Sequence, residues 1–184
     1  IRTVTIPHLA LCLPLDSVSM LASSLEMRIV KRGAAPLGGG EIFFRAPLIA
    51  TLRPLNFVEP GRIRKIRGIA SAVRVSPQMS NRMIDAARSV LNRYIPDLYL
   101  FSDVYRGDES GKSPGFAMSL VATSTTGAMH ASETTSLPGQ TPEDVGLLTA
   151  RSLLASIESG GCVDAMHQPL ILILMALGPE DVAR

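Results

Sequence analysis

Cysteine, histidine and charge are all scarce in this sequence of 184 residues. It holds two cysteines and three histidines, and charged residues make up 18% of it. Cys12 and Cys162 lie far apart in apolar surroundings, which favours two buried free thiols over a disulfide and indicates a reducing compartment. His8, His130 and His167 are isolated from one another and from the cysteines. No Cys/His cluster therefore has the spacing of a metal site, and we expect no metal or other cofactor.

Long apolar runs are missing as well. The longest, Leu170 to Leu177, is far shorter than the ~20 residues that a membrane helix needs, and no signal peptide is visible. With 46% hydrophobic residues, the composition favours a packed core over disorder. We therefore expect a soluble, intracellular protein with no membrane partner. The chain begins at Ile1 rather than at a methionine and ends at Arg184 just after a helix-stop signal, which favours a segment of a longer protein lacking both termini.

Acidic residues are absent from one stretch, Pro60 to Ile84, although the net charge of the whole chain is only +2. A basic stretch in an otherwise balanced protein indicates a surface for nucleic acid or for an acidic partner. The alternative is a solvated strand face that neighbouring residues balance. The basic residues of the stretch are Arg62, Arg64, Lys65, Arg67, Arg74 and Arg82. The candidate RNA- or partner-binding residues are Arg62, Arg64, Lys65, Arg67 and Arg74.

The segment 106–116, RGDESGKSPGF, contains a Gly-Lys-Ser that resembles the end of a phosphate-binding loop. Such a loop needs a glycine five positions before its second glycine. Here Gly107 lies four positions before Gly111, and the fifth position is Arg106. The loop must also open a helix, whereas residues 116–123 alternate as in a strand. We therefore interpret 106–115 as a polar connection between two strands.

The apolar pattern predicts helices and strands in alternation. A short helix is expected over 1–13, and strands over 25–32 and 41–48 form a hairpin across GAAPLGGG. Ser76 and Pro77 begin the clearest helix. The further strands expected are one within 62–75, one from 97 to 107, and a pair within 115–133 that turns near residues 126–127. The helix that begins at Ser76 and Pro77 should bury a face made of Met79, Met83, Ala86 or Ala87, Val90 and Tyr94.

Two helices are expected after the loop at 134–142. Thr141 and Asp144 form a capping box for the first, Gly160 and Gly161 end it, and its predicted apolar stripe is Leu147, Ala150, Leu154 and Ile157. The second spans 164–177, and because it is apolar nearly all round we expect it to be buried. The fold class is α/β (α+β), divided into 1–59, a small α/β module at 60–133, and 134–184.

Local patterns assemble no catalytic group of residues. No nucleophile elbow appears, and the paired carboxylates Glu143 and Asp144 are explained as first-turn residues that face a helix dipole.

One stretch has a specific pattern. Residues 32–42, RGAAPLGGGEI, fit R-G-x-x-P-x-G-G-G-x-[LIV], the signature by which the chain resembles the RNA 3′-terminal phosphate cyclase family. The three glycines permit a tight backbone turn near a neighbour or a ligand. The signature-loop residues are Arg32, Gly33, Pro36, Gly38, Gly39 and Gly40.

The remaining sequence is similar to the eukaryotic, cyclase-like branch of that family. The similarity lies in residues 64–91, in SGKSPGF at 110–116 and in GGCVDAMHQPLILILMALG at 160–178. It covers nearly all of 25–184 and is weaker over 14–24. True cyclases carry a different glycine-containing turn where this chain has SGKSPG. The resemblance implies repeated βαβ-type units, which make up the large domain and carry 60–133 as a small α/β insert.

The resemblance also implies a function. The cyclase-like branch belongs to the small-subunit processome in the nucleolus, where it binds a large ribosome-assembly GTPase and is needed for early cleavages of pre-rRNA. True cyclases have an Asp-Gln pair where this chain has His167-Gln168, so the active-site acid is missing. We therefore expect a catalytically inactive, nuclear assembly factor. A pre-rRNA endonuclease, and an active cyclase that uses ATP and a divalent metal, are the alternatives.

Overall fold

The computed structural model describes residues 3–14 and 25–180. Ile1, Arg184 and most of the weakly similar stretch 14–24 lie outside the described residues. The elements in chain order are α1 (Thr5–Leu11), β1 (Glu26–Lys31), β2 (Glu41–Arg45), β3 (Ile63–Val73), α3 (Pro77–Leu91), β4 (Leu98–Tyr105), a 3₁₀ turn (Gly107–Glu109), β5 (Gly115–Ser124), β6 (Met129–Thr135), α4 (Pro142–Ser159) and α5 (Gln168–Ala176). This mixed composition confirms the predicted α/β class.

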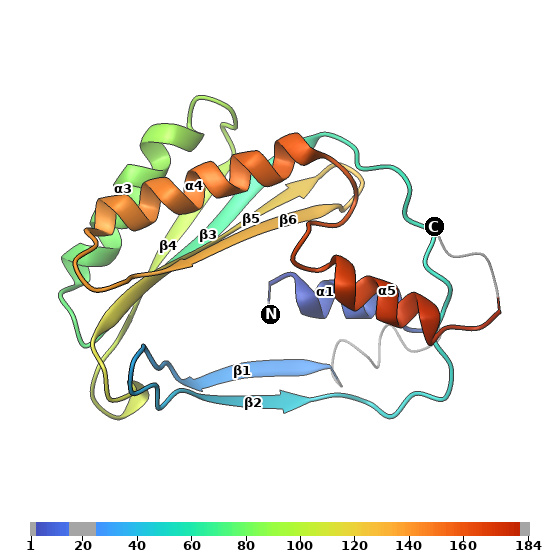
Figure 1. Cartoon of the computed structure of the whole chain (residues 1–184), viewed down its shortest axis with the longest axis horizontal. Coiled ribbons are helices and arrows are strands. Elements are labelled where there is room, and N and C mark those ends of the chain that lie inside the picture. Colours follow the sequence, from blue (N-terminus) through green and yellow to red (C-terminus); the bar gives the residue numbers. More distant parts are fainter. Residues whose placement is uncertain (1–2, 15–24, 181–184) are drawn as a thin grey trace.

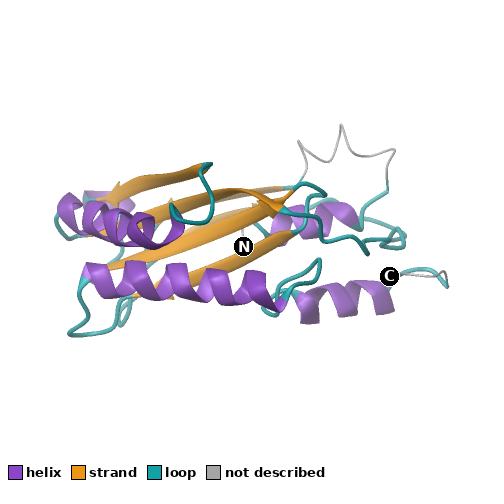
Figure 2. Ribbon diagram, turned by 90° about the horizontal axis from the view of Figure 1, so that it is seen from above, coloured by secondary structure: helices purple, strands orange, loops and turns teal. Residues whose placement is uncertain are grey.

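Four strands form the main sheet in the order β4-β3-β5-β6. β3 and β4 are parallel and are joined by α3, whereas β5 is antiparallel to both β3 and β6. Helices α3 and α4 lie side by side on one face of the sheet (Figures 1 and 2). The core between them is built from alternate strand residues such as Ile66, Ala70 and Leu120, together with Met83 and Leu153 of the helices.

The helix ends agree with the local signals. Ser76 Oγ accepts a hydrogen bond from the Gln78 amide at the start of α3. Thr141 and Asp144 form the predicted capping box of α4, which ends at Gly160 with a positive φ of 70°. Each cap satisfies backbone groups that the helix leaves without an internal partner.

The predicted buried faces of these two helices are partly wrong. Tyr94 is exposed and lies beyond the end of α3, and the fully buried residues of α4 are shifted from the predicted stripe. The shift arises because α4 packs on α3 as well as on the sheet, and Gly146 lets the two backbones approach. A Cβ at Gly146 would collide with the Met83 carbonyl oxygen. The residues buried on α4 are Pro142, Val145, Gly146, Thr149, Ala150 and Leu153.

Strands β1 and β2 form the predicted antiparallel hairpin. In Figure 1 the hairpin lies on the side of the sheet opposite to α3 and α4. Its strands are largely exposed, and Phe43 and Phe44 of β2 both reach solvent.

The prediction of a buried helix over 164–177 is wrong in two respects. The helix begins only at Gln168, and of its residues Ile171 alone is buried, whereas Leu172 and Ile173 are exposed. Only part of its circumference packs against described residues, so its apolar surface is not enclosed. Just before the helix, the side chains of Asp164 and His167 are buried, whereas Met166 between them is exposed.

Candidate functional site

The signature loop docks onto the segment that resembled a phosphate-binding loop. The Gly111 amide donates to the Arg32 carbonyl at 2.8 Å, and the Lys112 amide donates to the Gly38 carbonyl at 3.3 Å. In the other direction, the Leu37 amide donates to Ser113 Oγ at 3.0 Å. Two segments more than seventy positions apart in the sequence thus share a small network of hydrogen bonds from backbone amides. The 106–115 segment is the strand connection that was predicted.

Glycine is required on both sides of this contact. A Cβ at Gly111 would overlap the Gly38 carbonyl oxygen and lie 2.8 Å from the Gly33 Cα, distances that real Cβ atoms do not show. Gly38 and Gly39 adopt positive φ angles of 62° and 78°, where other residues are strained. In this structure the glycines of the signature therefore make a close backbone-to-backbone contact.

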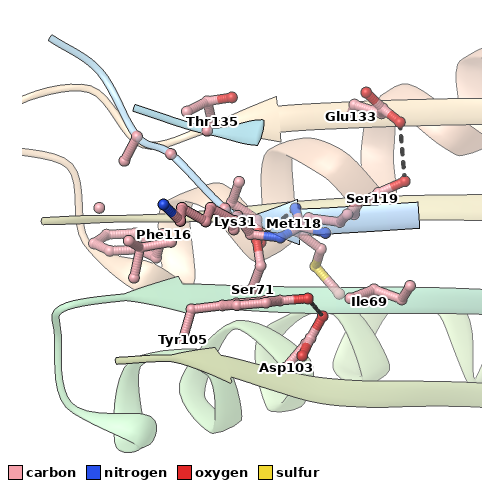
Figure 3. A pocket seen from close by; sticks show the side chains of 18 of the residues that line it. Lys31, Ile69, Ser71, Asp103, Tyr105, Phe116, Met118, Ser119, Glu133 and Thr135 are labelled. Carbon is pink, nitrogen blue, oxygen red and sulfur yellow. Dashed lines mark hydrogen bonds between the residues drawn. The ribbon is translucent and has the colours of Figure 1, made fainter. Parts of the chain in front are cut away.

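A cavity of about 430 Å³ lies beside this junction, between the hairpin and the open face of the sheet. Figure 3 shows Lys31 of β1 above Ser71 of β3, with the Tyr105 and Asp103 side chains of β4 joined by a hydrogen bond. The Ser119 hydroxyl donates to the Glu133 carboxylate across β5 and β6. The lining combines apolar strand residues with both signs of charge.

Arg32 is the charged residue of the signature and lies at the edge of this cavity. Its guanidinium lies over the Tyr105 ring, 5.3 Å from the ring centroid, and its Nη1 donates to Ser71 Oγ at 3.4 Å. Its buried Nε has no hydrogen-bond partner among the described atoms. Burial and the hydrogen bond to Asp103 raise the pKa of the Tyr105 hydroxyl. Arg32 thus joins the signature loop to the open face of the sheet.

Four of the five predicted binding residues gather at the start of β3. Arg62 and Arg64 are exposed, and Lys65 and Arg67 follow them on the strand, with an irregularity in the pairing between Ile63 and Lys65. We call Arg62, Arg64, Lys65 and Arg67 the basic group. The carboxylate of Asp97 pairs with Arg67 at 2.8 Å. The hydrogen bond from Arg67, with the charges of the group, lowers the pKa of Asp97.

Arg74 does not belong to this group. It follows the far end of β3, about 23 Å from Arg67 at 3.3 Å per strand residue. Its backbone has a positive φ of 53°, and its Nε donates to the Gly111 carbonyl at 2.6 Å. Arg74 therefore supports the docked loops rather than the basic group.

His167 lies in a buried polar cluster. Its Nδ1 is 2.6 Å from Asp164 Oδ1, and its Nε2 is 3.0 Å from Thr5 Oγ1 of α1. The second Asp164 oxygen accepts from the Ala131 amide at 2.8 Å. A carboxylate thus orients an imidazole that reaches a hydroxyl, which is the arrangement of a base that activates a nucleophile. A second hollow of about 280 Å³ borders Thr5 and His167.

His8 completes this cluster from α1. Its ring packs edge-on against the His167 ring with centroids 5.3 Å apart, and neither of its ring nitrogens has a partner among the described atoms. Burial, and then the nearby His167, lower the pKa of His8, while Asp164 acts in the opposite direction. Burial therefore disfavours the protonated form of the His8 imidazole.

Sequence reasoning missed Asp164, Thr5 and His8 as neighbours of His167. The Asp-x-x-His spacing of Asp164 and His167 is a local signal that marks one turn of chain, but nothing local links either residue to α1. Both cysteines are free, and Cys162 is only partly buried. Among the described residues, no group of three or more His, Cys, Asp or Glu is placed to hold a metal. No helix in the described ranges is long and apolar enough to cross a membrane.

Comparison with known proteins agrees with the signature. Residues 58–158 match the family model of the RNA 3′-terminal phosphate cyclase insert domain. The match includes α4, which packs on α3 and on the same sheet. The division of the chain at residues 60 and 133 stays a prediction.

Curated relatives extend the similarity beyond the insert. The chain is 51% identical to the RNA 3′-terminal phosphate cyclase-like protein of Homo sapiens over 166 residues, 88% of this chain and 44% of the relative. It is 51% identical to an rRNA processing protein of Schizosaccharomyces pombe over 88% of this chain and 45% of that protein. A probable cyclase-like protein of Dictyostelium discoideum is 42% identical over the whole chain and 52% of its own length. The chain thus spans about half the length of these relatives, which are cyclase-like and rRNA processing proteins of eukaryotes. It belongs to the RNA 3′-terminal phosphate cyclase family.

Proposed function

We propose that this chain is part of a ribosome-biogenesis factor that binds pre-rRNA and acts without cyclase chemistry. The observation that carries the proposal is the basic group, four cations at one end of β3 with Asp97 as the acidic partner. Cations gathered at one end of a strand suit the phosphates of RNA. The similarity to a relative named as an rRNA processing protein supports the same assignment.

The proposal includes a place of action and a partner. The factor works in the small-subunit processome of the nucleolus, within the nucleus, and binds a large ribosome-assembly GTPase there. Early pre-rRNA cleavage depends on this assembly. The family resemblance is the support for these statements, and co-purification of the GTPase with the whole protein from nucleolar extract tests them.

RNA binding is tested by charge reversal within the basic group. Arg62→Glu with Arg64→Glu should weaken binding of a single-stranded RNA of about a dozen nucleotides. The plot of the logarithm of the binding constant against the logarithm of salt concentration should become less steep by about 1.4. Each lost contact with a single-stranded phosphate reduces the steepness by about 0.7. Arg88→Glu with Arg93→Glu makes the same change of charge at exposed positions on and just after α3, on the covered side of the sheet, and should leave the slope unchanged. Equal effects of the two pairs would contradict a specific role for the basic group.

Cyclase inactivity is a separate part of the proposal. His167 stands where true cyclases carry a carboxylate, and its Nδ1 is occupied by Asp164. Incubating the whole protein with ATP labelled at the α-phosphate and Mg²⁺ should leave the chain unlabelled beside a true cyclase that labels well. A labelled band would instead support the active cyclase.

One observation favours a pre-rRNA endonuclease as a second candidate. The Asp164–His167–Thr5 chain holds an oriented imidazole beside a hollow, and an imidazole of this kind can take the proton of an attacking hydroxyl. Cleavage of a pre-rRNA fragment by the whole protein, lost in His167→Ala and retained in His130→Ala, would establish it. His130 is the matched control, because its partner is Ser156 and not a carboxylate.

A further inference from the structure

The open face of the sheet carries an exposed aromatic pair outside the cavity. Tyr99 and Phe101 are 57% and 52% exposed, and their rings are tilted by 51° with centroids 4.6 Å apart. Alternation along β4 places them on the same face as Asp103 and Tyr105, which line the cavity. The pair therefore continues the face of the cavity toward the start of β4.

The basic group borders this aromatic pair. Arg67 is the β3 partner of Tyr99, and Ile69 is the partner of Phe101, so the guanidinium and the two rings lie on neighbouring strands about 4.8 Å apart. The Arg67 guanidinium pairs with the Asp97 carboxylate at 2.8 Å and donates to the Asp97 backbone carbonyl at 3.1 Å. Lys65 shares this face through the same alternation. A fixed cation and two ring faces are thus exposed side by side.

We propose that Tyr99 and Phe101 form a base-stacking platform for single-stranded RNA, with the basic group holding the adjacent phosphates. This inference rests on the proposed RNA-binding function and names the surface that performs it. Single-stranded nucleic acid is bound by combining positive charge along the backbone with aromatic rings under the bases. Unstacked RNA bases are available for this contact, whereas those of a duplex are not.

The surroundings favour RNA over an apolar protein segment as the occupant. The exposed large apolar side chains here are the two rings, and their partners on β3 are Arg67 and the half-buried Ile69, with Lys65 beyond Arg67 on the same face. Both carboxylates that flank the rings along this segment are already paired: Asp97 with Arg67 at 2.8 Å, and Asp103 with the Tyr105 hydroxyl at 2.7 Å. Charge complementarity therefore points to a polyanion with flat, apolar groups.

The test replaces the rings while keeping apolar surface. Tyr99→Leu with Phe101→Leu should weaken binding of a single-stranded RNA by about tenfold or more, the effect of losing at least one stacked base. The salt dependence should stay that of the unaltered chain, because no phosphate contact is removed. Tyr94→Leu is the matched control, since Tyr94 is an exposed tyrosine just after α3. Both variants alter exposed rings and should unfold like the unaltered chain.

An abasic oligonucleotide of the same length separates stacking from charge. The unaltered chain should bind RNA about tenfold more tightly than the abasic strand, and the leucine variant should lose that preference. If the chain binds RNA through the basic group and the leucine variant keeps full affinity, the platform is refuted while the proposed function survives. If the unaltered chain binds no RNA, both fail. A leucine variant that binds RNA normally and loses the GTPase would reassign the rings to a protein partner.

Discussion

Gly111→Ala tests whether the two loops form one structural unit. The new methyl group would overlap the Gly38 carbonyl and press on the Gly33 Cα at 2.8 Å. These neighbours are backbone atoms, so they cannot rotate away as a flexible side chain would. The variant must therefore strain the junction or separate the signature loop from the 110–113 segment.

The expected loss follows from either outcome. Inserting a methyl group into a close-packed site costs about 1–3 kcal/mol. Separation would break the bonds from Gly111 to Arg32 and from Lys112 to Gly38, each worth about 1 kcal/mol. We expect the free energy of unfolding to fall by about 1–3 kcal/mol. The melting temperature should then fall by about 2–12 °C, because 1 kcal/mol shifts a domain of this size by about 2–4 °C.

Urea and thermal unfolding followed by circular dichroism measure this loss. Gly107→Ala is the control, because its φ is 57° but nothing lies within 4 Å of an added Cβ. It should cost only about 1 kcal/mol, from backbone conformation alone. If Gly111→Ala costs no more than Gly107→Ala, close packing of the two loops is refuted.

Three further changes test the helix caps and the titratable groups. Ser76→Ala removes the acceptor of the Gln78 amide and should lower the free energy of unfolding by about 1 kcal/mol, measured in urea. The hydrogen bond from Arg82 lowers the pKa of Glu143 in the folded chain. The ionised Glu143 therefore contributes to the free energy of unfolding above the ordinary glutamate pKa, and this contribution is lost as pH falls through the lower pKa of the folded state. Arg82→Ala should therefore flatten the acid limb of the stability curve, and an unchanged limb would contradict this. Because burial lowers the pKa of His8, unfolding takes up a proton below about pH 6.5, and stability is lost as pH falls through that range. His8→Phe removes this titrating group and should reduce that loss of stability. Urea unfolding at several pH values measures the difference.

The parts of the fold that were predicted correctly depend on local chemistry. Ser76, Thr141 and Gly160 act on backbone groups within one turn of themselves, so their effect is visible in the sequence. The buried face of α4 was shifted because it depends on α3, through the contact between Gly146 and Met83. The apolar periodicity of one helix does not show which of its residues a second helix will cover.

The candidate site shows the same division. The glycines of the signature and of the 110–116 segment predicted turns, but not that Gly111 packs against Gly38, since no local signal encodes that contact. The basic stretch was evident from composition, yet only the strand register separates Arg74 from the basic group. The aromatic pair was missed because Tyr99 and Phe101 look like ordinary strand residues until one face of the sheet is found to be open.

The two ends of β3 therefore have different roles. Val73 lies beside the docked loops, where the signature and the 110–113 segment stabilise each other. Arg67 and its partner Tyr99 lie about 20 Å away along the strands, and Phe101 about 13 Å, at 3.3 Å per residue. The stretch that resembles a phosphate-binding loop is at the structural end, and its lysine amide is already bonded to the Gly38 carbonyl. Damage to the loops should lower stability and leave the salt dependence of RNA binding intact. Charge reversal in the basic group should reduce that salt dependence and leave stability unchanged. This separation distinguishes a scaffold with one RNA surface from a chain in which the signature loop itself contacts the ligand.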